Sequence, residues 1–180
     1  ELQRAERQYQ AIFHDPNILV GLIDTDGTVL DINETAMDYV DILHEDVIGM
    51  PFWETAWFDH SASLQEEVKT WVDRAMDGEY VEFETDLVRP TGEPYTVEGV
   101  FRPVTNDDGE VVSLIISDRE VTEQKEYERV LERTNALLST LFETLPIGVI
   151  AEDEERNVVA VNEQLVDLFD FPGTPDELRG

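Results

Sequence analysis

The sequence predicts an α+β domain with one antiparallel sheet, and the order of its apolar segments leads to this prediction. Two short apolar strands come first, and several helical segments follow them. Three longer strands, in which apolar and polar residues alternate, then follow one another through short turns. Strands joined by hairpins pair antiparallel, and helices grouped between them cover one face of the sheet.

The first two strands are expected at residues 20–24 and 29–32. Asp26-Gly27 lies between them, and this dipeptide is a strong hairpin signal because both central turn residues need a positive φ. Asn33 follows directly and is expected to cap a helix over residues 34–40. Residues 43–60 show no regular pattern, so we expect only short helical turns there.

The pattern becomes regular again at residue 61. Residues 61–76 place apolar side chains on one helical face, and Asp77-Gly78 ends the helix. Strands are then expected at residues 81–87, 95–104 and 111–117. The first of these has an apolar face and a polar face, which is typical of a half-buried antiparallel strand.

A long helix is predicted over residues 119–145, which contain neither glycine nor proline. Thr122 is the expected N-cap of this helix. Apolar or semi-polar residues recur in alternating steps of four and three, and this 3.5-residue period favours packing against a second helix. We therefore predict a parallel homodimer, to which the amphipathic residues 1–16 contribute. The predicted seam consists of Tyr127, Leu131, Thr134, Leu138 and Leu141.

An internal repeat follows the long helix. Gly21-Leu22-Ile23 recurs as Gly148-Val149-Ile150, and the strand that ends at Asn33 recurs as a strand that ends at Asn162. In this alignment the turn of the second copy is two residues longer. Because the second copy stops early, we expect the chain to be a piece of a larger protein. The predicted organisation is a helix (1–16), a complete domain (17–121), a connector helix (122–145) and the start of a second domain (146–180).

Composition restricts the function. The net charge is −30, and only two of the basic residues are lysines. Such a charge is tolerated where salt screens it, so we expect a protein from a salt-rich cytoplasm; an acidic partner-binding surface and a nucleic-acid mimic are the alternatives. Binding to nucleic acid is disfavoured because no basic patch exists. The absence of cysteine excludes disulfides and cysteinyl-flavin photochemistry. No apolar run reaches the length of a membrane span.

The order of these elements resembles the PAS domain, a sensor module of signalling proteins. The residues that carry the resemblance are the 21–33 hairpin running into a helix, the Val47-Ile48-Gly49 segment, and the exit Arg119-Glu120-Val121-Thr122-Glu123-Gln124-Lys125. The family has an aspartate where this chain has Glu120. Pro51-Phe52-Trp53-Glu54-Thr55 is similar to archaeal members, in agreement with the acidity, and indicates a haloarchaeal type.

The resemblance implies a sheet of strand order 2-1-5-4-3. It also implies a signal that passes through the exit helix to a kinase, a transducer or a regulator. Glu120, Val121 and Thr122 are then the expected relay, although Glu120 and Thr122 have the simpler alternative of capping the helix.

Aromatic residues are the candidates for a ligand pocket between the helices and the sheet, with a filled core as the alternative. These residues are Trp53, Trp57, Phe58, Trp71 and Phe83. His14, His44 and His60 are scattered, and His60 is the best ligand candidate among them. We expect no tightly bound cofactor, no metal site and no catalytic constellation, so an enzymatic activity would belong to a histidine kinase elsewhere in the protein. The sequence thus favours a cytoplasmic sensory module, and the alternative is a dimerisation module without a ligand.

Overall fold

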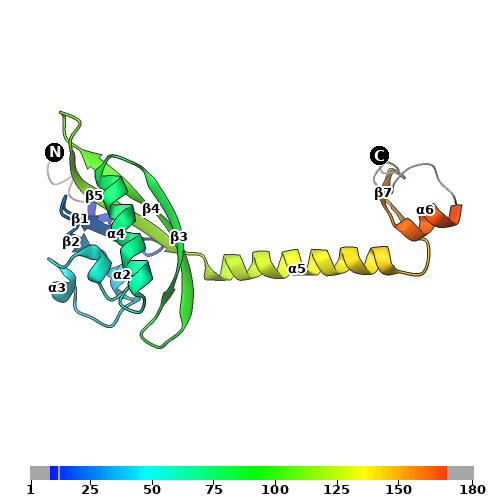
Figure 1. Cartoon of the computed structure of the whole chain (residues 1–180), viewed down its shortest axis with the longest axis horizontal. Coiled ribbons are helices and arrows are strands. Elements are labelled where there is room, and N and C mark those ends of the chain that lie inside the picture. The colour runs from blue at the N-terminus through cyan, green and yellow to red at the C-terminus, as the bar shows by residue number, and fades with distance from the viewer. Residues whose placement is uncertain (1–8, 12, 170–180) are drawn as a thin grey trace. The chain divides into compact units, whose positions relative to one another are not determined.

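The computed structural model describes residues 9–11 and 13–169. It divides into two compact units, Glu1–Glu123 and Gln124–Gly180, which we describe separately (Figure 1). The elements of the first unit are β1 (Leu19–Ile23), β2 (Val29–Ile32), α2 (Glu34–Met37), α3 (His44–Val47), the 3-10 helix η1 (Phe52–Glu54), α4 (Ala62–Met76), β3 (Val81–Val88), β4 (Pro94–Thr105) and β5 (Val111–Glu120). The helix α5 (Thr122–Thr144) begins at its end. The second unit contains β6 (Ile150–Glu152), β7 (Val158–Val161) and α6 (Glu163–Phe169).

The first unit is the predicted α+β domain. Its five strands form one antiparallel sheet of order β2-β1-β5-β4-β3, which confirms both the fold class and the strand order. Each predicted strand is present within a few residues of its expected ends. The last strand extends beyond the prediction, to Glu120, and residues 118 and 120 thereby join the sheet.

The core lies between the sheet and the helices on one of its faces, here called the inner face (Figure 1). α4 buries Leu64, Val68, Val72 and Ala75, which recur at helical spacing, and Ser61 caps its first turn by accepting from the backbone N–H of Leu64. The sheet contributes Ile23, Leu114 and Phe101 among others. Burial of these apolar side chains is the main stabilising term of the unit.

Asn33 ties the first hairpin to the helix that follows it. Its side-chain oxygen accepts from the backbone N–H groups of Val20 (2.9 Å) and Ala36 (3.0 Å), and its amide donates to the carbonyl of Ile18 (2.9 Å). The N-cap role predicted for Asn33 is therefore confirmed. The helix is shorter than expected and ends at Met37.

A short helix precedes the sheet. The rings of Tyr9 and Phe13 stack at 5.1 Å between centroids, and Phe13 is buried. Leu2, Ala5 and Ile12, which belong to the same predicted amphipathic helix, lie outside the described residues.

The second unit repeats the first hairpin, but the alignment expected from the sequence is wrong. Asn162 accepts from the N–H groups of Val149 and Leu165 and donates to the carbonyl of Ile147. Each of these residues has a number 129 higher than the corresponding partner of Asn33, and Asn162 itself has a number 129 higher than Asn33. β6 and β7 pair with the same register, including the irregular step before Glu152. The two turns have equal length. The similarity of Gly148-Val149-Ile150 to Gly21-Leu22-Ile23 placed the sequence alignment two residues out of register.

Packing explains why the glycines do not correspond. Gly148 takes the position of Leu19, and Leu165 takes the position of Ala36. A Cβ on Gly148 would lie 2.6 Å from Cδ1 of Leu165, so the large residue is on the strand side in the first copy and on the helix side in the second. The second pair has one methyl group less than the first, and the distribution of volume between strand and helix is reversed.

Candidate functional site

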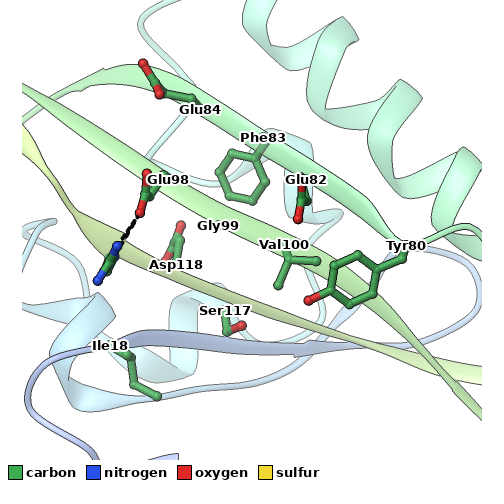
Figure 2. Close-up of a pocket in the computed structure, with 11 residues that line it drawn as sticks. Ile18, Tyr80, Glu82, Phe83, Glu84, Glu98, Gly99, Val100, Ser117 and Asp118 are labelled. Carbon is green, nitrogen blue, oxygen red and sulfur yellow. Dashed lines mark hydrogen bonds and ion pairs between the residues drawn. The ribbon is translucent and has the colours of Figure 1, made fainter. Parts of the chain in front are cut away.

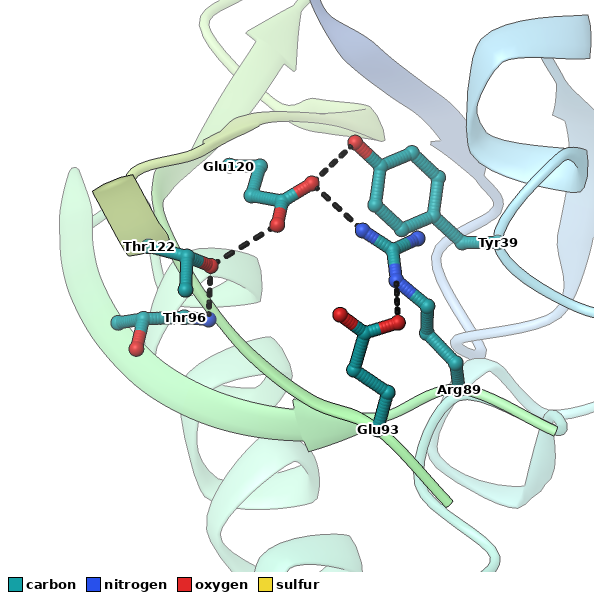
Figure 3. A network of polar contacts seen from close by, with 6 residues as sticks. All are labelled: Tyr39, Arg89, Glu93, Thr96, Glu120 and Thr122. Carbon is teal, nitrogen blue, oxygen red and sulfur yellow. Dashed lines mark hydrogen bonds and ion pairs between the residues drawn. The ribbon is translucent and has the colours of Figure 1, made fainter. Parts of the chain in front are cut away.

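A network of polar side chains surrounds the junction between β5 and α5 (Figure 3). Glu120, near the end of β5, accepts from the Tyr39 hydroxyl (2.8 Å), the Arg89 guanidinium (2.8 Å) and the Thr122 hydroxyl (2.9 Å). The Thr122 hydroxyl accepts in turn from the backbone N–H of Thr96 on β4 (2.9 Å). The network thus joins the first residue of α5 to the segment after α2 and to the β3–β4 hairpin.

Arg89 lies against two neighbouring aromatic rings. The centre of its guanidinium lies 4.4 Å from the ring centroid of Tyr39 and 4.7 Å from that of Tyr95. Glu93 adds a longer ion pair at 3.8 Å. The two rings are themselves 5.0 Å apart between centroids, so the guanidinium lies against a pair of neighbouring rings, and these contacts together with the ion pair to Glu120 hold it in place.

The network sets the ionisation of its carboxylate. Burial alone would raise the pKa of Glu120, but hydrogen bonds from Tyr39, Thr122 and Arg89 and the charge of Arg89 outweigh it and lower this pKa. The pKa of Tyr39 is raised, first by burial and then by its bond to Glu120. Glu120 is therefore a stable anion and Tyr39 a stable donor at neutral pH.

The three predicted relay residues lie together here. Val121 is buried, and its N–H donates to the carbonyl of Thr96 (2.8 Å). Thr122, which was expected to cap the helix from outside, is instead the first helical residue. Its hydroxyl accepts from the backbone N–H of Thr96 and donates to Glu120, because both partners lie beside it at the end of the sheet.

The five aromatic residues of the predicted pocket separate into three places. Trp57 and Phe58 line a small cavity on the inner face of the sheet. Trp53 lies over the first hairpin, where its ring would meet a Cβ on Gly27 at 2.4 Å, and Lys69 Nζ approaches its other side at 5.7 Å. Trp71 and Phe83 stack on each other, with centroids 5.1 Å apart.

The inner cavity has a volume of about 30 Å³, room for one water molecule. Its walls are apolar apart from Asp118 of β5, which lies on the same strand face as the buried Leu114 and Ile116. Burial raises the pKa of Asp118 to about 7, and a hydrogen bond from its own backbone N–H acts in the opposite direction. The sequence prediction ended β5 at residue 117 and so missed this carboxylate; the apolar alternation 114, 116 continued to 118 is the signal that indicates it.

The opposite, outer face of the sheet carries an open hollow of about 700 Å³ (Figure 2). Tyr80, Val100 and Ser117 form its floor, and carboxylates surround them. Arg119 pairs with Glu98 at the rim, with contacts of 2.6 and 2.9 Å. Phe83, one of the aromatic residues of the predicted pocket, is among the residues that line this hollow. Its carboxylates are Glu82, Glu84, Glu98 and Asp118, so Asp118 lines both this hollow and the inner cavity.

Two of the histidines named above, His44 and His60, lie away from the polar network and from both hollows. His44 contacts Asp31 at 3.1 Å on the surface, and His60 is exposed. In the described ranges, no three potential ligands from histidine or carboxylate side chains gather in a way that could hold a metal ion. No helix of that part of the chain is long and apolar enough to span a membrane.

The predicted seam residues of α5 are exposed within their own unit. The exposed fractions are 79% for Tyr127, 62% for Leu131, 58% for Leu138 and 51% for Leu141, and Thr134 is exposed as well. No residue of α5 is buried. This apolar row is the largest set of exposed hydrophobic side chains on any one described helix.

Comparisons with known proteins agree with this architecture. Residues 13–126 match the family described as PAS fold, and residues 136–179 match a second family described as PAS domain. The chain is 31% identical over 128 residues to the hybrid signal transduction histidine kinase D of Dictyostelium discoideum, covering 70% of this chain and 8% of that protein. It is 29% identical over 147 residues to the sensor histidine kinase TmoS of Ectopseudomonas mendocina, covering 81% and 15%.

A solved structure shows the same fold. The PAS domain of BvgS from Bordetella pertussis superposes with a TM-score of 0.56 at 20% identity, covering 74% of this chain and 98% of that one. The chain spans less than a sixth of either curated relative, and the family match to a PAS fold covers residues 13–126. With a five-stranded sheet of order 2-1-5-4-3, a helical cover and a family match over more than half its length, the chain belongs to the PAS family.

Proposed function

We propose that this chain is a cytoplasmic sensory module that detects a small ligand or a redox state in its first PAS domain and relays it through α5 to a signalling output domain. The polar network around Glu120 carries this proposal. It connects α5 to two segments of the helical cover and sheet, so a change in either segment alters the groups that hold the first turn of α5.

A histidine kinase is the output that the two curated relatives favour, because both are sensor kinases. A transducer or a response regulator would use the same connector. The acidity of the chain, with its net charge of −30, supports an origin in a salt-rich, haloarchaeal cytoplasm.

The relay can be tested in the complete protein that contains these residues, by measuring autophosphorylation or the corresponding output. Glu120→Gln removes the charge that holds Arg89 while preserving shape, and we expect the output to change several-fold. Glu98→Gln is the matched control, since it breaks a comparable arginine pair on the outer face of the same sheet. Equal effects of the two substitutions would exclude Glu120 as a specific relay.

The second candidate function is a dimerisation module without a ligand, and the exposed apolar row of α5 favours it. The two functions are compatible, because a relay through paired helices needs the dimer. They differ in whether occupancy of the inner cavity changes the output.

A further inference from the structure

We infer that Asp118 and Trp57 form the polar end of a binding site for a small primary amine that also carries a hydrogen-bond acceptor. This inference rests on the proposed sensory function and names the class of ligand. Both side chains line the inner cavity, and the remaining wall is apolar.

Asp118 lies on the same face of β5 as the buried Leu114 and Ile116, is itself only half-buried, and lines the outer hollow as well as the inner cavity. Within the described residues no side chain donates a hydrogen bond to it or forms an ion pair with it. A carboxylate in an apolar environment requires a cation or a proton. Arg89, the cation that acts on the neighbouring Tyr95, is already bound to Glu120 and contacts the rings of Tyr39 and Tyr95.

The indole of Trp57 contributes a hydrogen-bond donor without an acceptor. Trp57 is 5% exposed, and its Nε1–H is buried without an acceptor in the described part of the chain. The Tyr95 hydroxyl is also buried without a partner, and burial followed by the negative charge of Asp118 raises the pKa of Tyr95. Buried polar groups in native proteins are normally satisfied, so the cavity wall lacks both a donor for Asp118 and an acceptor for Trp57.

A glycine lies opposite Asp118 in the sheet. Gly99 on β4 pairs with Asp118, and a Cβ at position 99 would lie 2.3 Å from the Asp118 Cβ. Because the clash is with the Cβ of residue 118 and with the backbone, glycine at position 99 is required for the close approach of the two strands and for any side chain at position 118. An apolar residue at position 118 would continue the apolar face formed by Leu114 and Ile116, but this chain has an aspartate there.

These groups select the chemistry of the ligand. An ammonium group offers charge-assisted hydrogen bonds to Asp118, which a neutral alcohol does not. A hydroxyl or carbonyl on the same molecule would accept from Trp57. The indole and the Phe58 ring are suitable walls for an organic cation. The cavity of about 30 Å³ admits the head group alone, so the rest of the ligand has to displace Phe58, which lies in the irregular segment before α4, while Trp57 keeps its contact with the ligand.

The test measures binding of three small probes to the full chain in amine-free buffer, by calorimetry. The probes are 2-aminoethanol, propylamine and propan-1-ol, which have similar size. We expect 2-aminoethanol to bind at least tenfold more tightly than propan-1-ol, with propylamine between them. Asp118→Asn should remove the preference for amines over the alcohol, and Trp57→Phe should remove the preference for 2-aminoethanol over propylamine.

A second measurement does not depend on a variant. Because the pKa of Asp118 is about 7, binding of the amine to the unmodified chain should strengthen up to about tenfold between pH 6 and pH 8. Tyr95 on β4, Tyr39 after α2, Arg89 after β3 and Glu120 on β5 are the ionisable groups on the core side near this site, and none of their pKa shifts brings a titration into this range. On the outer face, Glu82, Glu84, Glu98 and Arg119 line the same hollow as Asp118.

Three outcomes would overturn the inference: equal affinity for amine and alcohol, amine binding that survives Asp118→Asn, or binding that does not change between pH 6 and pH 8. A cavity that holds only a water molecule would give no measurable binding of any probe, which also overturns it. None of these results affects the output test of Glu120→Gln, so failure of the amine site and failure of the relay are separable.

Discussion

Arg156 holds, in the turn between β6 and β7, the left-handed backbone conformation that Gly27 holds in the turn between β1 and β2. Their φ angles are 72° and 83°, and both N–H groups donate to the carbonyl of the aspartate three residues earlier, Asp153 or Asp24. Arg156 is the one non-glycine residue with positive φ in the described ranges. A side chain is unfavourable in this conformation, whereas glycine is not.

Arg156→Gly is therefore expected to stabilise the second hairpin by about 1 kcal/mol. The substitution loses the ion pair with Glu152, but that pair is exposed and contributes little. Hydrogen exchange of the β6 and β7 amides measures the effect. The converse change, Gly27→Ala, should destabilise the first hairpin by more, since its Cβ would also meet the Trp53 ring. Faster exchange in Arg156→Gly would contradict the assignment of this turn.

Glu120→Gln should lower the free energy of unfolding by about 1–2 kcal/mol at pH 7 through the loss of charge-assisted hydrogen bonds. The folded state lowers the pKa of Glu120 below its ordinary value of 4.5, so the stabilisation is present above that pH and disappears as the pH falls through the folded pKa. Urea denaturation at pH 7 and pH 3 provides the measurement. A difference that does not decrease at all between pH 7 and pH 3 would show that packing, and not charge, causes the loss.

Asp118 should affect stability in the opposite direction. Its pKa rises from 3.8 to about 7 on folding, so unfolding releases a proton between these values and the stability it confers falls as the pH rises from 4 to 7. The shift corresponds to at most about 4 kcal/mol. Comparing the unfolding free energies of the unmodified chain and Asp118→Asn at pH 4, 5.5 and 7 isolates this group from the other acids. A constant difference across the range would mean that Asp118 titrates as an ordinary carboxylate.

Leu131→Asp with Leu138→Asp should give a monomer by sedimentation, because the proposed seam would place two carboxylates at each of the two substituted contacts. Glu132→Asp with Arg133→Lys, two conservative changes outside the predicted seam, are the control. Sedimentation should use about 100 µM chain in multimolar KCl, so that salt screens charge repulsion between the chains. An unmodified chain that stays monomeric there would remove the seam hypothesis.

The thermal midpoint should rise steadily between about 0.1 and 3 M KCl, since salt screens the repulsion among the acidic side chains that give the net charge of −30. Thermal unfolding followed by circular dichroism gives the midpoint. An unchanged value would indicate that the acids serve a partner surface.

The fold could be predicted from the sequence because its signals are local. Alternation along β3, the helical spacing of the α4 core residues and Asn33 at its cap each specify an element without reference to distant residues. The strand order is not local, and the resemblance to the PAS family supplied it.

The site was harder to predict because its residues are joined only by the folded sheet. Glu120 was identified from the exit motif, but Tyr39 and Arg89 lie 81 and 31 residues away from it, and no spacing rule connects them. Asp118 was missed because an acidic residue just after a predicted strand is normally interpreted as a surface residue. Its opposition to Gly99 becomes visible only when β4 and β5 are paired.

The reversed pair of large and small residues limits how the two PAS copies can be recombined. Residues 18–33 and 147–162 have the same length and the same hydrogen-bond pattern, so one hairpin could replace the other without insertion or deletion. Such an exchange would nevertheless bring Leu19 against Leu165, where the second copy has only the space left by Gly148. A viable chimera must therefore carry the hairpin and the helix after it together, so the smallest exchangeable unit of this chain is the hairpin with its capped helix.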